Sequence, residues 1–129
     1  MTTNERKLIE EQIRYYRARA PEYDDWFFRR GRYDRGEEHR REWNAEAATA
    51  EAALREARPS GRILELACGT GLWTRHLAPP ADEMTAVDAS PEVLRLNRER
   101  VGSAHVHYIE ADLIGWQPTG QYDFIFFGF

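Results

Sequence analysis

Acidic side chains and glycines that could hold a ligand stand close together in the middle of this 129-residue chain. Glu65 lies near the end of the apolar run 62–66, and Gly69 and Gly71 follow it. Glycine has no Cβ, so the backbone at these positions can approach a ligand closely. The first N–H groups of a helix after Gly71 would be unpaired and partly positive, which suits a carboxylate. In open α/β sheets, ligands bind at such a strand-to-helix turn.

A second acidic residue, Asp88, ends the apolar run 84–88. It lies about 17 residues beyond Gly71, close to the offset at which an acid accepts hydrogen bonds from ribose hydroxyls. Ser90 and Pro91 suit the N-cap and the first position of a following helix. The spacing therefore fits a ligand that carries a ribose.

The elements that would position these residues alternate along the chain. Strands are predicted for residues 62–66, 84–88, 105–109 and 122–128, and helices for residues 71–78 and 91–101. Strands that alternate with helices indicate a parallel sheet with right-handed crossovers. The predicted fold class is therefore α/β with a parallel sheet.

The N-terminal part is predicted to be helical. One helix is expected over residues 4–20, and Ala20-Pro21 is expected to end it because the residue before a proline avoids the helical conformation. A loop rich in aromatic residues and arginine follows. Residues 37–57 form a second helix with apolar residues at helical spacing. We expect an N-terminal helical cap, residues 1–60, and an α/β core, residues 61–129.

Four segments resemble, in order, the motifs of class I S-adenosylmethionine (SAM)-dependent methyltransferases. They are Glu65-Leu-Ala-Cys-Gly-Thr-Gly71, Val87-Asp-Ala-Ser-Pro91, Glu110-Ala-Asp-Leu113 and Tyr122-Asp-Phe-Ile-Phe126. The resemblance covers residues 61–129, with a looser match at residues 15–24. It implies a Rossmann-like three-layer sandwich and SAM as cofactor. Ala67 departs from the family, which often has glycine there, but a small residue should fit.

The resemblance implies a cofactor role for each matching residue. Glu65 and the turn Gly69–Gly71 would hold the methionine end of SAM, and Asp88 would bind the ribose hydroxyls. Asp112 would accept a hydrogen bond from the adenine amino group. The N-terminal helix would close over the cofactor through Tyr23, with Tyr15 or Arg19 as further candidates. The expected cofactor-binding residues are Tyr23, Glu65, Ala67, Cys68, Gly69, Gly71, Asp88, Ala89, Asp112 and Leu113.

A structural interpretation stays open at several of these positions. Gly69 and Gly71 could form an ordinary tight turn, Asp88 could only start a helix, and Asp112 could be a solvated loop residue. Tyr23 could be a packing residue. Cys68 is interpreted as a small apolar residue rather than a nucleophile, because the motif places no histidine beside it. No catalytic residue is identified.

Composition restricts the classes of partner. The net charge of −4 argues against a general nucleic-acid binder. The arginines between residues 29 and 41 alternate with acids and indicate a salt-bridged face, although the aromatic residues nearby could border an acceptor pocket. No apolar run reaches membrane-spanning length, and the N-terminus lacks a secretory signal. The single cysteine fits a reducing compartment, so a cytoplasmic protein is expected. No metal site is expected, because His105 and His107 have no second metal-ligand partner at a recognisable spacing.

The fourth predicted strand poses a problem of exposure. The resemblance implies seven strands, of which this sequence supplies four, so Phe124, Ile125, Phe126, Phe127 and Phe129 would lie on an open edge. Leaving such side chains in water would forfeit about 1.5–3 kcal/mol each. The chain is then a fragment of a longer enzyme, a homo-oligomer or strand-swapped dimer that uses this edge, or one of two chains that complete the sheet.

The function indicated is methyl transfer from SAM to an oxygen, nitrogen or carbon of a small molecule, catalysed largely by alignment of donor and acceptor. A non-catalytic SAM-binding module or partner subunit is the alternative. A nicotinamide-dependent oxidoreductase is a further alternative, but Thr74 stands where its fingerprint has a third glycine.

Overall fold

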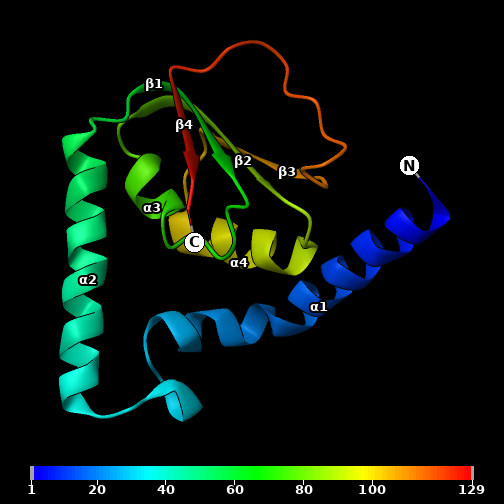
Figure 1. Ribbon diagram of the computed structural model, residues 1–129. Coiled ribbons are helices and arrows are strands. Elements are labelled where there is room, and N and C mark those ends of the chain that lie inside the picture. The colour runs from blue at the N-terminus through cyan, green and yellow to red at the C-terminus, as the bar shows by residue number, and fades with distance from the viewer. Residues whose placement is uncertain (1, 129) are drawn as a thin grey trace.

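The computed structural model describes residues 2–128, except for the side chain of Tyr16. Phe129, expected in the apolar run of the last strand, lies outside the described residues. The elements, in chain order, are α1 (Thr3–Phe27), the 3₁₀ helix η1 (Gly31–Tyr33), α2 (Glu37–Glu56), β1 (Gly61–Leu66), α3 (Thr74–Leu77), β2 (Ala81–Asp88), α4 (Pro91–Val101), β3 (Val106–Glu110) and β4 (Phe124–Phe127) (Figure 1). No helix among the described residues has the length and apolar character needed to cross a membrane.

The strands form one four-stranded sheet in the order β3-β2-β1-β4, and every pairing is parallel. The predicted α/β, Rossmann-like fold with a parallel sheet is confirmed. Figure 1 shows β1, β2 and β4 pointing toward α1, which passes below their carboxyl ends. The ends of the strands, where the predicted site residues follow, therefore meet the N-terminal helix.

The register of the strands decides which residues share a face of the sheet. Glu65 pairs with Ala86 on β2 and with Phe126 on β4, and Ala86 pairs with Tyr108 on β3. This face also carries the fully buried Ile63 and packs against α3 and α4. The hydrophobic core therefore lies between this face and the helices.

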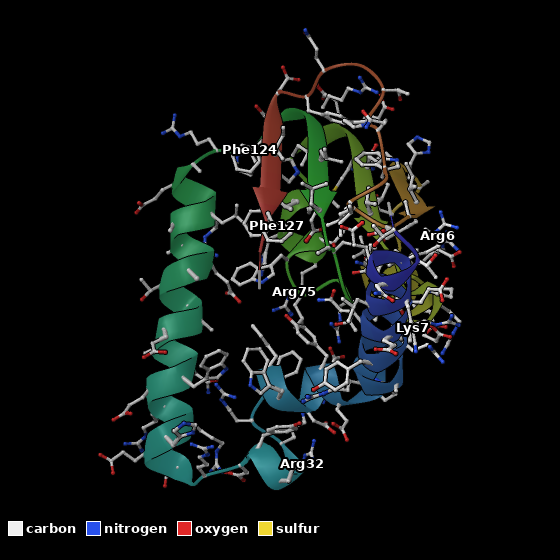
Figure 2. All side chains as sticks on the ribbon, turned by 45° about the vertical axis from the view of Figure 1, so that its right-hand side comes forward. Arg6, Lys7, Arg32, Arg75, Phe124 and Phe127 are labelled. Atoms are coloured by element: carbon white, nitrogen blue, oxygen red, sulfur yellow. The ribbon has the colours of Figure 1, made fainter. Side chains whose placement is uncertain are left out.

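The fourth strand buries only alternate residues. Phe124 and Phe126 are half-buried on the face of the core, where the ring of Phe126 lies 5.8 Å from that of Trp73. Ile125 and Phe127 point to the other face and are 60% and 67% exposed. The expectation that the whole run lies open was thus too broad, because two of its rings are covered. Figure 2 labels Phe124 at the start of β4 and Phe127 at its end.

The first helix is longer than predicted, and the expected end at Ala20-Pro21 is wrong. Pro21 lies inside α1, which continues to Phe27. A proline in a helix removes one hydrogen bond and costs about 3 kcal/mol or more. The segment around it is nevertheless anchored, since Ala20 and Phe27 are 3% and 4% exposed. Tertiary packing therefore overrides the local preference of proline.

Other boundaries differ by a few residues. Helix α3 is confined to Thr74–Leu77, shorter than the predicted 71–78, since Gly71 has a φ of 97° that no α-helix accepts. Strand β2 begins at Ala81 rather than at residue 84. Helix α4 begins as predicted, with Ser90 accepting a hydrogen bond from the N–H of Val93.

Candidate functional site

A cavity of about 740 Å³ lies at the carboxyl ends of the strands, between them and α1. Its wall includes residues from α1, from the turn after β1, from the end of β2 and from the loop after β3. The predicted site residues in the wall are Tyr23, Ala67, Cys68, Gly69, Asp88, Ala89, Asp112 and Leu113. Residues that are far apart in the sequence are therefore brought together in one cavity, whose size suits a small-molecule ligand.

The two glycines of the turn have different roles. Gly69 has a φ of 56°, and a Cβ added there would meet no heavy atom within 4 Å, so this position faces open space. Gly71 is not part of the cavity wall. A Cβ on Gly71 would lie 2.9 Å from the side-chain oxygen of Asn97, so packing requires glycine at this position. Ala67 has a φ of 52°, a conformation that glycine adopts without strain.

Asp88 fastens the turn from the neighbouring strand. Its Oδ2 accepts from the backbone N–H of Gly69 at 3.0 Å, and its Oδ1 accepts from that of Ser90 at 3.0 Å. A carboxylate offers about four acceptor positions, so two remain for a ligand. The helix cap itself is Ser90. Asp88 therefore has a structural contact at each oxygen and also lies in the cavity wall.

Glu65 lies beneath the cavity rather than in its wall. It is 2% exposed and accepts a hydrogen bond from the hydroxyl of Thr74. Burial raises the pKa of Glu65 to about 8; Asp88 adds to this rise and the Thr74 bond opposes it. Glu65 is not among the residues of the cavity wall, and its expected role at the methionine end of SAM stays a prediction.

Asn97 on α4 joins Glu65 to the glycine turn. Its Nδ2 donates to Thr74 Oγ1 at 2.9 Å and to the carbonyl of Gly69 at 3.1 Å, and its Oδ1 accepts from the hydroxyl of Tyr108 at 2.7 Å. Asn97 is fully buried. The sequence analysis missed it, although an amide at a core-facing position of a helix is a usable signal, because buried polar groups need partners.

Three side chains hold α1 against the turn. Asp24 on α1 accepts from Arg100 on α4 at 2.5 Å and from the hydroxyl of Thr70 at 2.6 Å. Arg100 also donates to the carbonyl of Thr70 at 3.2 Å. A second ion pair, Arg17 to Glu92 at 2.8 Å, joins the same two helices. No sequence signal distinguished these residues, since each resembles an ordinary surface residue.

Tyr23 and Cys68 complete this part of the wall. Burial raises the pKa of Tyr23 to about 12, with contributions from Asp24, Glu65 and Asp88, so its hydroxyl stays protonated. Burial also raises the pKa of the Cys68 thiol well above its usual value. A protonated thiol is a poor nucleophile, so the interpretation of Cys68 as a structural residue is favoured.

Asp112 lies in the loop after β3. Its Oδ1 accepts from the N–H of Ile114 at 3.1 Å, which closes a local turn, and its side chain is half-buried in the cavity wall. Leu113 lies beside it. An acidic group next to an apolar side chain can present an acceptor and a flat apolar contact to a ring.

Known proteins similar to this chain are methyltransferases. A family model described as "Methyltransferase domain" matches residues 63–129. The malonyl-[acyl-carrier protein] O-methyltransferase of Anoxybacillus flavithermus is 34% identical over 85 residues, which are 64% of this chain and 33% of that protein. Nodulation protein S of Bradyrhizobium diazoefficiens is 33% identical over 76 residues, which are 56% of this chain and 36% of that protein.

Solved structures agree with this finding. A complex of DhpI with S-adenosylhomocysteine (SAH) superimposes with a TM-score of 0.75 and 41% identity, over 93% of this chain and 52% of the DhpI chain. A complex described as DhpI-SAM-HEP gives a TM-score of 0.73 and 42% identity. The chain thus spans about half the length of DhpI and about a third of the two curated relatives. The match over residues 63–129 shows that the chain belongs to the methyltransferase domain family.

Proposed function

We propose that this protein binds SAM in the cavity and transfers the SAM methyl group to a small-molecule acceptor. The observation that carries the proposal is that Gly69, Asp88 and Asp112 line one cavity in a chain of this family. Relatives solved with SAM or SAH, which include the two DhpI complexes, support the choice of cofactor. The domain division into residues 1–60 and 61–129 is part of this proposal.

The residues present fit SAM. The open space at Gly69 would admit the methionine end, and the remaining acceptor positions of Asp88 would take the ribose hydroxyls. Asp112, Leu113 and Ala89 would border the adenine, and Tyr23 would cover the cofactor from α1. The acidic side chains around the cavity also favour a ligand with positive charge. Glu65 would affect SAM binding indirectly, through Thr74 and the glycine turn.

Bound SAM would supply an electrophilic methyl carbon on a sulfonium. The residues of this chain would contribute orientation, because Asp88 and Asn97 fix the glycine turn from two sides. Helix α1 would exclude water from the cavity, since Asp24 and Arg100 fasten it to Thr70. Alignment of two reactants and removal of solvent are large contributions to a displacement reaction.

The acceptor class is proposed from relatives. They include a malonyl-carrier O-methyltransferase and CalS10, an amino pentose methyltransferase, which is 27% identical with a TM-score of 0.51. Oxygen and nitrogen both occur as methylated atoms in the names of relatives, since another relative is a dTDP-amino-sugar N,N-dimethyltransferase. Net negative charge supports an acceptor other than nucleic acid. We also propose a cytoplasmic location.

A non-catalytic SAM-binding module is the second candidate. It is favoured by the exposed side chains of Ile125 and Phe127 on β4, which offer an apolar surface to a partner. The same edge supports a homo-oligomer or a strand-swapped dimer. Isothermal calorimetry with SAM tests binding, and transfer of a labelled methyl group to a panel of acceptors tests catalysis. Binding without transfer would favour the module.

A further inference from the structure

A second cavity, of about 250 Å³, lies where α1 passes through η1 into α2. Its wall consists of Trp26, Arg29, Tyr33, Arg35 and His39. Figure 2 labels Arg32 on η1, at the bottom of the molecule between the ends of the two long helices. Trp26 also lines the larger cavity, so the two cavities adjoin.

Arg29 is held rigidly in the wall of this pocket. Its guanidinium carbon lies 3.7 Å from the ring centroid of Trp43 and 5.0 Å from that of Trp26, and Nη1 donates to the carbonyl of Trp26 at 3.0 Å. Its Nε is buried and has no acceptor among the described residues. The backbone of Arg29 is also unusual, with a φ of 55°. A buried donor without an acceptor is costly, so this N–H is suited to a ligand.

Two more nitrogen-bearing side chains face the same pocket. The Nδ1 of His39 is buried without a hydrogen-bond partner in the part of the chain that the structure describes. Arg35 is exposed, and within residues 2–128 neither it nor Arg29 lies within ion-pair distance of a carboxylate. The wall itself contains no acidic residue.

The two acids nearest to Arg35 in the sequence have other partners. Asp34 accepts from Arg40 at 2.6 Å, and Glu37 accepts from Arg41 at 2.9 Å. Since no carboxylate within residues 2–128 pairs with Arg29 or Arg35, their positive charges are available to another group. The N–H donors of a guanidinium lie in one plane and can bond two oxygens of a carboxylate or a phosphate at once. Arginine is therefore the preferred residue for binding such groups.

We propose that this pocket is a binding site for an oxyanion, a carboxylate or a phosphate group. The proposal goes beyond the proposed function and does not depend on it, because the wall residues other than Trp26 are not part of the wall of the larger cavity. An ordered water could occupy the same space, so the experiment must separate an anion from water.

Titration with inorganic phosphate, and separately with acetate, tests the site. The indole N–H signals of the protein are followed by NMR, with ionic strength held constant by sodium chloride. We expect saturable shifts of the Trp26 and Trp43 signals with one anion or both, and the stronger arm identifies phosphate or carboxylate. Absence of a saturable shift with either anion would overturn the proposal and leave the pocket to water.

Variants distinguish a specific anion site from a general effect of net charge. Arg35→Gln should weaken anion binding roughly tenfold, because a charged hydrogen bond is lost. The matched control is Arg41→Gln, which removes the same charge from an exposed position on α2 and should leave the affinity unchanged. Equal weakening by both would mean that only net charge matters, which contradicts the site. His39→Gln provides a second variant in case Arg35→Gln is poorly folded, and it too should weaken binding.

SAM calorimetry on the same sample distinguishes this inference from the proposed function. If anions cause no saturable shift but SAM binds, only the proposed anion site is refuted. Saturable anion shifts without SAM binding refute the proposed function alone.

Discussion

The side-chain amide of Asn97 donates to the hydroxyl of Thr74 at 2.9 Å, and through it α4 is connected to the buried Glu65. The same amide reaches the carbonyl of Gly69, so one residue sets both the support of the acid and the shape of the turn. Position 74 carries threonine where a dinucleotide fingerprint would have glycine. Here the hydroxyl has a defined structural role.

Asn97→Ala should destabilise the fold and weaken SAM binding. It leaves the hydroxyl of Tyr108 and the carbonyl of Gly69, both part-buried, without their present partner, at up to about 1–3 kcal/mol for each such group. Urea unfolding gives the loss of stability, and calorimetry gives the loss of affinity. Arg95→Ala, on the exposed side of the same helix, is the control and should change neither by more than about 0.5 kcal/mol. Unchanged SAM affinity in a folded Asn97→Ala variant would contradict the positioning role.

Stability should fall as the pH rises from about 4.5 to about 8. The folded pKa of Glu65 is raised above that of the unfolded chain, so the folded state binds more protons across this range. Its contribution to stability is complete below the unfolded pKa and is lost as the pH passes through the folded value. The loss is on the order of a few kcal/mol. Chemical unfolding at several pH values measures it.

Glu65→Gln is the matched variant for this pH dependence. Glutamine still offers an oxygen to the hydroxyl of Thr74 but cannot ionise. The slope between pH 4.5 and 8 should therefore flatten. A variant with the slope of the wild type would show that other groups cause it.

Ala67→Gly should stabilise the protein by roughly 0.5–1 kcal/mol, because the left-handed φ of 52° costs a residue with a Cβ more than the extra chain entropy of glycine costs. Ala53→Gly, in the regular part of α2, is the control and should destabilise by about 0.5–1 kcal/mol. Thermal unfolding of both variants gives the two signs. Destabilisation by both would mean that the turn at position 67 is not strained.

Asp24→Asn should loosen α1 over the cavity. The change weakens the ion pair with Arg100, whose side chain is 26% exposed, by about 1 kcal/mol, and SAM affinity should fall several-fold. Hydrogen exchange of the amides in the second half of α1 reports the opening. Asp25→Asn removes the adjacent charge, which has no ion pair among the described residues, and serves as control. Equal hydrogen exchange in the two variants would contradict the role of Asp24 in fastening α1 over the cavity.

Local pattern predicted much of this fold. The apolar runs around residues 63, 85, 107 and 125 identified the four strands, and Ser90-Pro91 identified the start of α4. The motif residues Gly69, Asp88 and Asp112 proved to share a cavity because parallel strands end at one edge of the sheet.

What the sequence did not predict depends on contacts between distant segments. The continuation of α1 through Pro21 is supported by burial of Phe27 and by the pairing of Asp24 with Arg100, 76 positions away. The buried position of Glu65 beneath the cavity depends on its hydrogen bond with Thr74, which Asn97 in turn supports. No local propensity or spacing rule predicts these contacts, since they form only when α1, α3 and α4 pack together.

The most direct test of the account is a calorimetric titration of this chain and its Asp88→Ala variant with SAM, SAH and NAD. We expect one SAM site in the wild type, no preference for NAD, and at least about tenfold weaker SAM binding in Asp88→Ala, since hydrogen bonds to a carboxylate are lost. Asp82→Ala, an exposed acid on β2, should bind as the wild type does. No heat with SAM, a preference for NAD, or full SAM affinity in a folded Asp88→Ala variant would contradict the cavity as the cofactor site.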